Sequence, residues 1–266
     1  MRKITINLAA VAAFCIVVAS PTLVSSSCAT PKTEQEDTTI IREDSGITAL
    51  KYSSPEVPAS IEFCGKTIDL SRFDRHERMD RELLAFTYMH STSLQMLKKA
   101  NRYFPIVEPI LKENGIPDDF KYLMVIESNM NPTARSSAGA AGLWQFMQGT
   151  GRDYGLEVNN NVDERYHIEK ATRAACRYLK DAYAKYKDWV AVAASYNAGQ
   201  ARIASQLAKQ DVDDSLDLQL VEETARYVYR ILAAKQLFNA PTTFGFRLRA
   251  SDLYKRQRLF LIRKSL

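Results

Sequence analysis

The sequence predicts a mainly α-helical protein, and three observations support this fold class. Apolar residues recur at helical spacing in residues 74–114, 167–186 and 218–238. The apolar run over residues 120–126 is nearly continuous, which is typical of a helix that is buried on most of its faces. Strand-like alternation of apolar and polar residues is almost absent, and no internal repeat is evident. We therefore expect helices throughout, with at most a short turn or strand at residues 64–70.

Length and composition fit one sizeable domain with tails. The chain has 266 residues, of which 46% are hydrophobic, and this is enough for a substantial core. The formal net charge of +5 would fall to +3 if Arg2 and Lys3 were removed with an export signal. So small an excess does not require an acidic partner, and we expect no nucleic-acid partner. It is compatible with weak attraction to an anionic wall polymer or lipid surface.

The N-terminus has the layout of a bacterial export signal. A basic start at residues 1–3 precedes an apolar stretch over residues 4–18, and small residues follow up to Cys28. We therefore expect an exported, periplasmic protein. Acylation of Cys28 would make it an outer-membrane lipoprotein attached to the membrane through its N-terminus. Ser25 stands where such signals usually have an aliphatic residue, so cleavage without lipid and an uncleaved anchor helix also remain open.

Four cysteines and three scattered histidines give no support to a metal site. Cys15 and Cys28 fall in the signal region, which leaves Cys64 and Cys176 as either a disulfide pair or buried free thiols. No CxxC motif or His/Cys cluster is present. We expect neither a metal nor a cofactor.

The stretch from residue 117 to 148 is the most informative. Pro117-Asp118-Asp119 predicts a helix start with an acidic N-cap, and the apolar run that follows ends at Glu127. A carboxylate in this position loses hydration, which raises its pKa, so that Glu127 would hold a proton near neutrality and act as a general acid. A single buried Glu is more often paired with an arginine, but the residues that follow favour catalysis.

A helix break and a loop of small residues follow the acid. Pro132 ends the helix, and the Ser- and Gly-rich loop at residues 136–142 lets the backbone approach a ligand closely. Residues 143–147 are expected to start a new helix that carries Trp144 and Gln145. An acid, a close-approach loop, an aromatic ring and an amide together predict a sugar-binding groove.

Several motifs occur in a fixed order around this acid. They are Glu127-Ser128, NPTA at 131–134, SSAGA at 136–140, GLWQFM at 142–147 and SYNAG at 195–199. Together they resemble the SLT-type lytic transglycosylases of glycoside hydrolase family 23, in particular the membrane-bound transglycosylase D branch. The resemblance covers residues 106–246, and a series of spaced motifs is far more specific than any one of them.

The resemblance implies a fold like that of goose-type lysozyme and a reaction on the glycan strands of peptidoglycan. Glu127 would be the single catalytic residue. It would protonate the β-1,4 oxygen between N-acetylmuramic acid and N-acetylglucosamine, then take the proton of the muramoyl C6 hydroxyl, leaving 1,6-anhydro ends. The family usually has Pro and Ala in place of Gln148 and Gly151, so a looser helix is expected there.

The resemblance also implies a set of substrate-binding residues, with Tyr196 beside the catalytic acid. The set is Ser136, Gln145, Met147, Tyr196, Asn197, Glu223 and Tyr227. Glu223 and Tyr227 lie four residues apart on one predicted helix and therefore share a face. An ion pair of Glu223 with Arg226 or Arg230 is the alternative to sugar binding.

Two other functions compete with the lytic transglycosylase. The first is a lysozyme-like muramidase, in which Asp153, Asp163 or Glu164 would activate water for hydrolysis. The second is a non-catalytic peptidoglycan-binding scaffold that is tethered by its N-terminus. An acid at the end of an apolar run favours an enzyme, because a binding module has no need of one.

These inferences predict five segments. They are a signal segment (1–28), a flexible linker (29–60), a helical extension (61–115), an SLT catalytic domain (116–246) and a basic C-terminal tail (247–266). The helices of the extension are expected to pack on the catalytic domain. Asn114-Gly115 would end the extension as a helix C-cap.

Overall fold

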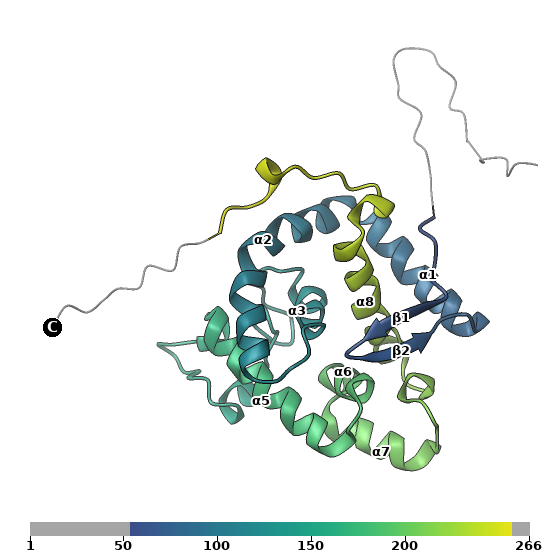
Figure 1. Cartoon of the computed structure of the whole chain (residues 1–266). Coiled ribbons are helices and arrows are strands. Elements are labelled where there is room, and N and C mark those ends of the chain that lie inside the picture. Colours follow the sequence, from purple (N-terminus) through teal and green to yellow (C-terminus); the bar gives the residue numbers. More distant parts are fainter. Residues whose placement is uncertain (1–53, 257–266) are drawn as a thin grey trace, which may run out of the picture. The chain divides into compact units, whose positions relative to one another are not determined.

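Helices make up most of the computed structural model, which describes residues 54–256 (Figure 1). The helices are α1 (Phe73–Tyr88), α2 (His90–Glu113), α3 (Phe120–Ser128), α4 (Gln148–Asp153), α5 (Ile168–Tyr186), α6 (Trp189–Ala198), α7 (Gln200–Gln210) and α8 (Glu222–Asn239). Short 3-10 helices are η1 (Glu164–Tyr166), η2 (Ser215–Asp217), η3 (Pro241–Phe244) and η4 (Ala250–Asp252). The mainly α prediction is confirmed. The predicted signal and most of the predicted linker lie outside the described residues.

A β-hairpin precedes the helices and is the only sheet within residues 54–256. Its antiparallel strands, β1 (Ser60–Phe63) and β2 (Lys66–Asp69), place Ile61 opposite Ile68. The turn between them contains Cys64 and Gly65, both with positive φ. Cys64 and Cys176 are free thiols, which decides between the two possibilities left open by the sequence.

The carboxylate of Asp119 fastens the hairpin to α3 and α8. It accepts a hydrogen bond from the backbone N–H of Cys64 at 2.7 Å and forms an ion pair with Lys235 of α8 at 2.8 Å. The sequence predicted that an acidic side chain caps the start of α3. This prediction is wrong for Asp119, because its carboxylate oxygens bind Cys64 and Lys235 instead. Lys235 also donates to the carbonyl of Glu62 in β1 at 2.6 Å.

Helix α3 occupies the centre of the described part of the chain, where it packs against α2 and α8 (Figure 1). Its side chains at Phe120, Leu123, Met124 and Val125 are completely buried. Burying each of these side chains stabilises the fold by roughly 1.5–3 kcal/mol. The sequence prediction of a helix buried on most of its faces is confirmed, so the acid at its end is carried by a rigid element.

Helices α5 and α6 pack against each other. Asp188 caps α6 by accepting the N–H of Val190 at 2.8 Å, and Trp189 stacks on Tyr183 with ring centroids 4.0 Å apart. Gly199 ends α6 with φ at 87°, in agreement with the predicted boundary. Helix α7 follows at once and was not predicted.

Residues 143–147 form turns instead of the predicted helix, which starts only at Gln148. Trp144 is completely buried, and its indole N–H donates to the Thr172 hydroxyl of α5 at 2.9 Å. This aromatic ring is therefore part of the core and does not line a groove. The segment is held by these tertiary contacts, which helical spacing does not reveal.

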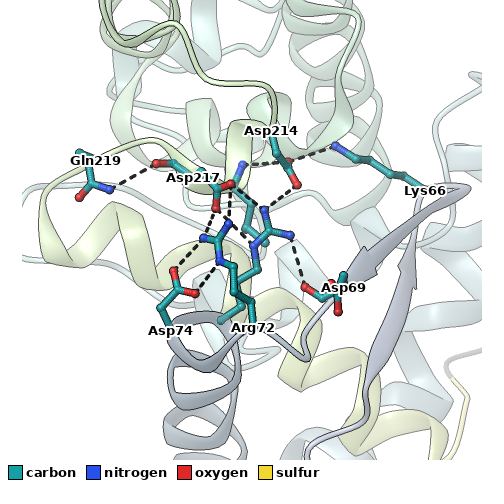
Figure 2. Close-up of polar contacts among 9 residues, drawn as sticks. Lys66, Asp69, Arg72, Asp74, Asp214, Asp217 and Gln219 are labelled. Carbon is teal, nitrogen blue, oxygen red and sulfur yellow. Dashed lines mark hydrogen bonds and ion pairs between the residues drawn. The ribbon is translucent and has the colours of Figure 1, made fainter.

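Ion pairs tie the start of α1 to the segment that precedes α8. Figure 2 shows Arg72 between Asp74 and Asp217. The neighbouring guanidinium of Arg75 is buried and donates to Asp214 at 2.8 Å and to Asp217 at 2.9 Å. These contacts join residues almost 140 positions apart, so α1 and α8 are fixed to each other at this end.

The segment after α8 returns to α2. The N–H of Tyr254 donates to the carbonyl of Lys98 at 3.1 Å, and Asn101 donates to the carbonyl of Tyr254 at 3.0 Å. The predicted basic tail is thus packed as far as residue 256. Within residues 54–256, none of the helices has the length and apolar character needed to cross a membrane.

Candidate active site

Glu127 lies in the last turn of α3, where the chain reverses sharply. Asn129 and Met130 both have positive φ, at 49° and 56°. Asn tolerates this left-handed conformation, whereas Met rarely adopts it. Met130 is completely buried, so its packing offsets the strain. The reversal terminates the helix directly after the acid.

The carboxyl group of Glu127 is paired with a neutral phenol. Tyr227 of α8, itself buried, donates a short hydrogen bond from its hydroxyl to Oε1 of Glu127. None of the ion pairs between described residues involves Glu127; the charged residues whose fields act on it are Arg230 and Glu223. Glu127 is therefore not the arginine-paired structural residue that was its main alternative.

The surroundings of Glu127 raise its pKa from 4.5 to about 7. Burial is the main cause, because it removes water from the charged form. The hydrogen bond from Tyr227 and the charge of Arg230 lower the pKa, while the charge of Glu223 raises it. A group with this pKa is able both to give and to take a proton near neutrality.

Tyr196 lies near Glu127 but directs its hydroxyl elsewhere. The hydroxyl donates to the carbonyl of Trp144 at 2.8 Å, and the ring packs edge-on against Tyr178 at 5.1 Å between centroids. Burial, together with the charge of Glu127, raises the pKa of Tyr196 well above its usual value. Two tyrosines thus flank the acid, and the direct hydrogen bond comes from Tyr227.

The loop after the acid is braced from inside. Oγ of Ser136 accepts the N–H of Ala140 at 3.0 Å. The side-chain amide of Gln145 donates to the carbonyls of Ala134 and Gly142, at 3.2 and 2.8 Å. Ser136 is exposed on this loop, whereas Gln145 faces a pocket.

Arg165 holds the loop from the other side. Its buried guanidinium donates to the carbonyls of Gly139 and Phe146, at 2.8 and 3.0 Å, and forms an ion pair with Asp163 at 2.6 Å. A Cβ atom on Gly142 would lie only 1.9 Å from the carbonyl oxygen of Arg165. The absence of a side chain at Gly142 therefore allows the close approach of the backbone at Arg165, and not of a ligand as the sequence predicted.

Two pockets adjoin the acid. The first, which we call the Tyr196 pocket, measures about 280 Å³ and is lined by Gln145, Phe146, Met147, Thr150, Tyr178, Tyr196, Asn197, Ala198 and Gly199. The second, the Arg230 pocket, measures about 270 Å³ and is lined by Glu82, Ala85, Phe86, Met89, Ile126, Asn129, Glu223, Arg226 and Arg230. Glu127 itself lines neither pocket, but Ile126, its neighbour in sequence, lines the second, and Tyr196, whose pKa the charge of Glu127 raises, lines the first.

Asn197 and Glu223 connect the two pockets. The amide of Asn197 donates to Glu223 at 3.4 Å and accepts the hydroxyl of Thr224 at 2.8 Å. Glu223 forms neither of the ion pairs considered for it. Arg226 is instead paired with Glu82 at 2.7 Å, and Arg230 donates to the carbonyl of Ile126 at 3.4 Å.

The predicted site residues are therefore distributed as follows. Gln145, Met147, Tyr196 and Asn197 line the Tyr196 pocket, Glu223 lines the Arg230 pocket, Tyr227 contacts Glu127, and Ser136 lines neither. Sequence reasoning did not assign Arg230 to the site. Its position three residues after Tyr227 places it on the same helical face, and this spacing was the available signal.

The carboxylates considered as activators of water are outside both pockets. Asp163 is paired with Arg165, whose hydrogen bonds hold the pKa of Asp163 below its usual range. Glu164 accepts a hydrogen bond from Lys170, which likewise lowers its pKa. Asp153 ends α4 and lines neither pocket. The described residues contain no cluster of three or more metal-ligating side chains.

Part of the chain is similar to known proteins. Residues 105–217 match the family described as the transglycosylase SLT domain. The membrane-bound lytic murein transglycosylase D of Escherichia coli (strain K12) is 30% identical over 181 residues, which cover 66% of this chain and 39% of that protein. The membrane-bound lytic murein transglycosylase C of Haemophilus ducreyi is 29% identical over 150 residues, covering 51% of this chain and 40% of that protein.

The chain thus spans about two fifths of the length of these two relatives. Among solved structures, the 70 kDa soluble lytic transglycosylase of Escherichia coli shares 18% sequence identity with this chain. Its TM-score is 0.48, over 67% of this chain and 33% of that one.

Proposed function

We propose that this chain is a peptidoglycan lytic transglycosylase with Glu127 as its acid and base. The match of residues 105–217 to the transglycosylase SLT domain family supports this proposal. The observation that carries the proposal is the environment of Glu127. Its carboxyl group is desolvated, is held by a phenol instead of a cation, and has Ile126 and Tyr196, which line two pockets, as neighbours.

The first step of the proposed reaction is protonation of the leaving group. Glu127 in its neutral form gives its proton to the glycosidic oxygen between N-acetylmuramic acid and N-acetylglucosamine. The bond from this oxygen to C1 of the muramoyl residue breaks, and positive charge develops at C1. The pKa of about 7 keeps a substantial fraction of Glu127 protonated at neutral pH.

The second step closes a ring within the same sugar. Glu127, now a carboxylate, takes the proton of the muramoyl C6 hydroxyl, and the oxygen of this hydroxyl attacks C1. The product carries a 1,6-anhydro ring, Glu127 regains its proton, and no water is consumed. A second catalytic carboxylate is not needed, because the nucleophile belongs to the substrate.

The neighbouring side chains have separate roles in the proposal. Tyr227 orients the carboxyl group and stabilises its charged form between the two steps, because its hydroxyl donates to Oε1. Gln145, Met147 and Asn197 form walls of the Tyr196 pocket and would hold one part of the glycan strand. Glu223 lies where the two pockets meet and would bind hydroxyl groups of the sugar.

The domain assignment and the location of the protein belong to the same proposal. The catalytic domain extends over residues 116–246 and carries the helical extension on its surface. Both relatives described above are named membrane-bound. We infer an exported protein that acts in the periplasm and is attached to the membrane through its N-terminus.

Replacement of Glu127 by Gln tests the proposal. Glu127→Gln keeps the acceptor for Tyr227 and removes the proton, so release of soluble fragments from purified sacculi should fall by about 10²- to 10⁴-fold. Circular dichroism should show an unchanged fold. Full activity of the variant would refute the assignment.

Mass spectrometry of the wild-type products tests the reaction type. Each new muramoyl end should be lighter by one water than the hydrolytic product. Ends of hydrolytic mass would make the protein a muramidase, and the absence of cleavage at any pH would make it a binding scaffold.

A further inference from the structure

The proposed mechanism gives the Arg230 pocket no ligand beyond the sugar hydroxyl groups assigned to Glu223. Ile126 and Asn129 from the end of α3 line it, so it lies directly beside the acid. Ala85, Phe86 and Met89 add apolar surface, and Met89 is 41% exposed. These three residues belong to α1 and the turn after it, outside the residues that match the SLT family. The helical extension thus builds part of a pocket at the active site.

Two arginines line this pocket, and they differ in how their charge is compensated. Arg226 donates to both oxygens of Glu82, at 2.7 and 3.1 Å, and Glu82 is almost completely buried. Arg230 donates only to the carbonyl of Ile126, at 3.4 Å. Among the ion pairs of residues 54–256, none includes Arg230. Its guanidinium is therefore available to an anion.

A second cation contacts Asn129, one of the residues that line the pocket. Nζ of Lys99, from α2, donates to the carbonyl of Asn129 at 3.4 Å and, within the described residues, forms no ion pair. Burial lowers the pKa of Lys99. Glu223 is the one lining carboxylate without an ion-pair partner in the described part of the chain, and it is oriented by Asn197. When Glu127 holds its proton, two cations without ion-pair partners, Arg230 and Lys99, stand against one carboxylate, Glu223, and this balance favours an anionic ligand.

We propose that the Arg230 pocket binds a carboxylate of the peptide stem that the muramoyl residue carries. This proposal rests on the proposed function, because it assigns the pocket to the same substrate. The lactyl group that bears the peptide is on the sugar whose C1 is attacked, so the peptide must leave the strand close to Glu127. Arginine matches a carboxylate in geometry as well as in charge. Ala85, Phe86 and Met89 would contact the apolar parts of the peptide.

Binding measurements on an inactive protein test this assignment. The probes are two synthetic muropeptides whose peptide carboxylates are either free or converted to carboxamides, and calorimetry in the Glu127→Gln background gives both affinities. A hydrogen bond to a charged group contributes about 1.5–3 kcal/mol. The free carboxylate form should therefore bind at least about tenfold more tightly than the carboxamide form.

Replacement of Arg230 by Gln should abolish this preference. The carboxamide form serves as the reference, because a folded pocket still binds it. Arg173→Gln is the matched control, since Arg173 is exposed on α5 and pairs with Glu113, and it should keep the preference. Equal affinities in the Glu127→Gln background, no binding of either probe, or a preference that survives Arg230→Gln would each overturn the proposal.

The alternative role of Arg230 and Lys99 is to stabilise the carbonyl end of α3. In that case Arg230→Gln would lower the melting temperature and leave the ratio of the two affinities unchanged. Failure of the proposed function has a different signature. The chain with Glu127 intact would then release no anhydro products, while the inactive protein would still prefer the carboxylate probe.

Discussion

Glu127 combines burial with the absence of a charged partner, and at the scale of the single residue this combination works against stability. Its pKa is about 7 in the folded protein, against an ordinary value of 4.5. The folded state therefore binds a proton more tightly than the unfolded state does. Below pH 4.5 both states carry the proton, and the charge has no effect on stability. As the pH rises through 7, the folded protein must bury a negative charge, and stability is lost.

Glu127→Gln is therefore expected to stabilise the protein in a pH-dependent way. The variant keeps the hydrogen bond to Tyr227 but cannot ionise. At pH 8 its free energy of unfolding should exceed that of the wild type by about 2–3 kcal/mol, and at pH 4.5 the difference should nearly vanish. Urea denaturation at several pH values measures this gain. Glu77→Gln, on the exposed side of α1, is the control and should give no such gain, because an exposed carboxylate keeps its hydration.

At the scale of the elements, prediction from sequence succeeded where a segment's own pattern determines its structure. The apolar run ending at Glu127 gave α3, and Gly199 gave the end of α6. Prediction from sequence failed where contacts with residues far away in the sequence determine the local structure. Residues 143–147 are held by contacts such as the bond from Trp144 to Thr172, and neither residue reveals this partner in the sequence.

Prediction of the site also succeeded where the local sequence was sufficient. Glu127 could be identified as a candidate acid because the apolar residues before it in the sequence predict that it is buried. The partner of its carboxyl group, Tyr227, lies one hundred positions away, and only the fold brings the two together. The sequence also does not show that Arg230 and Lys99 have no ion-pair partners. This can be found only from the structure, once the ion pairs of the described residues are known.

Two glycines near the active site should respond oppositely to the same substitution. Gly142 has φ at 78°, and a Cβ would lie 1.9 Å from the carbonyl oxygen of Arg165. Gly142→Ala should therefore destabilise the protein by about 3 kcal/mol or more, since strain adds to a backbone clash. Gly149 lies in α4, where a Cβ would meet no other part of the protein within 4 Å, so Gly149→Ala should stabilise by about 0.5–1 kcal/mol. Urea denaturation of both variants checks the signs, and a stable, active Gly142→Ala would contradict the close approach.

At the scale of the whole described unit, polar contacts over long sequence distances set how α1 lies on α8. Arg75 joins Asp214 and Asp217 at one end. Glu82 joins Arg226 further along, one residue before Tyr227. Helix α1, which lies in the proposed extension, thereby fixes α8, the helix that carries Tyr227, the hydrogen-bond partner of Glu127. We therefore expect the proposed extension to contribute to the geometry around Glu127 as well as to stability.

A double-mutant cycle measures this coupling. The side chain of Glu82 is 2% exposed and also pairs with Arg81 at 3.2 Å, so removing Arg226 leaves it with one cation, whereas removing Glu82 leaves Arg226 without its ion-pair partner. Glu82→Gln and Arg226→Gln should each cost about 2 kcal/mol of stability, less than a fully buried pair because Arg226 is 36% exposed. The double variant should lose clearly less than the sum, which gives a coupling energy of about 1–2 kcal/mol.

The exposed pair of Arg173 and Glu113 is the matched control for this cycle. Its side chains are 49% and 58% exposed, so water and salt screen the two charges. Its coupling energy should be about 0–0.5 kcal/mol. Equal coupling in the two cycles would mean that burial does not strengthen the contact between α1 and α8. The Glu82 pair would then fix the helix no more firmly than a surface ion pair does, and the position of Tyr227 would depend on apolar packing and on the ion pairs of Arg75.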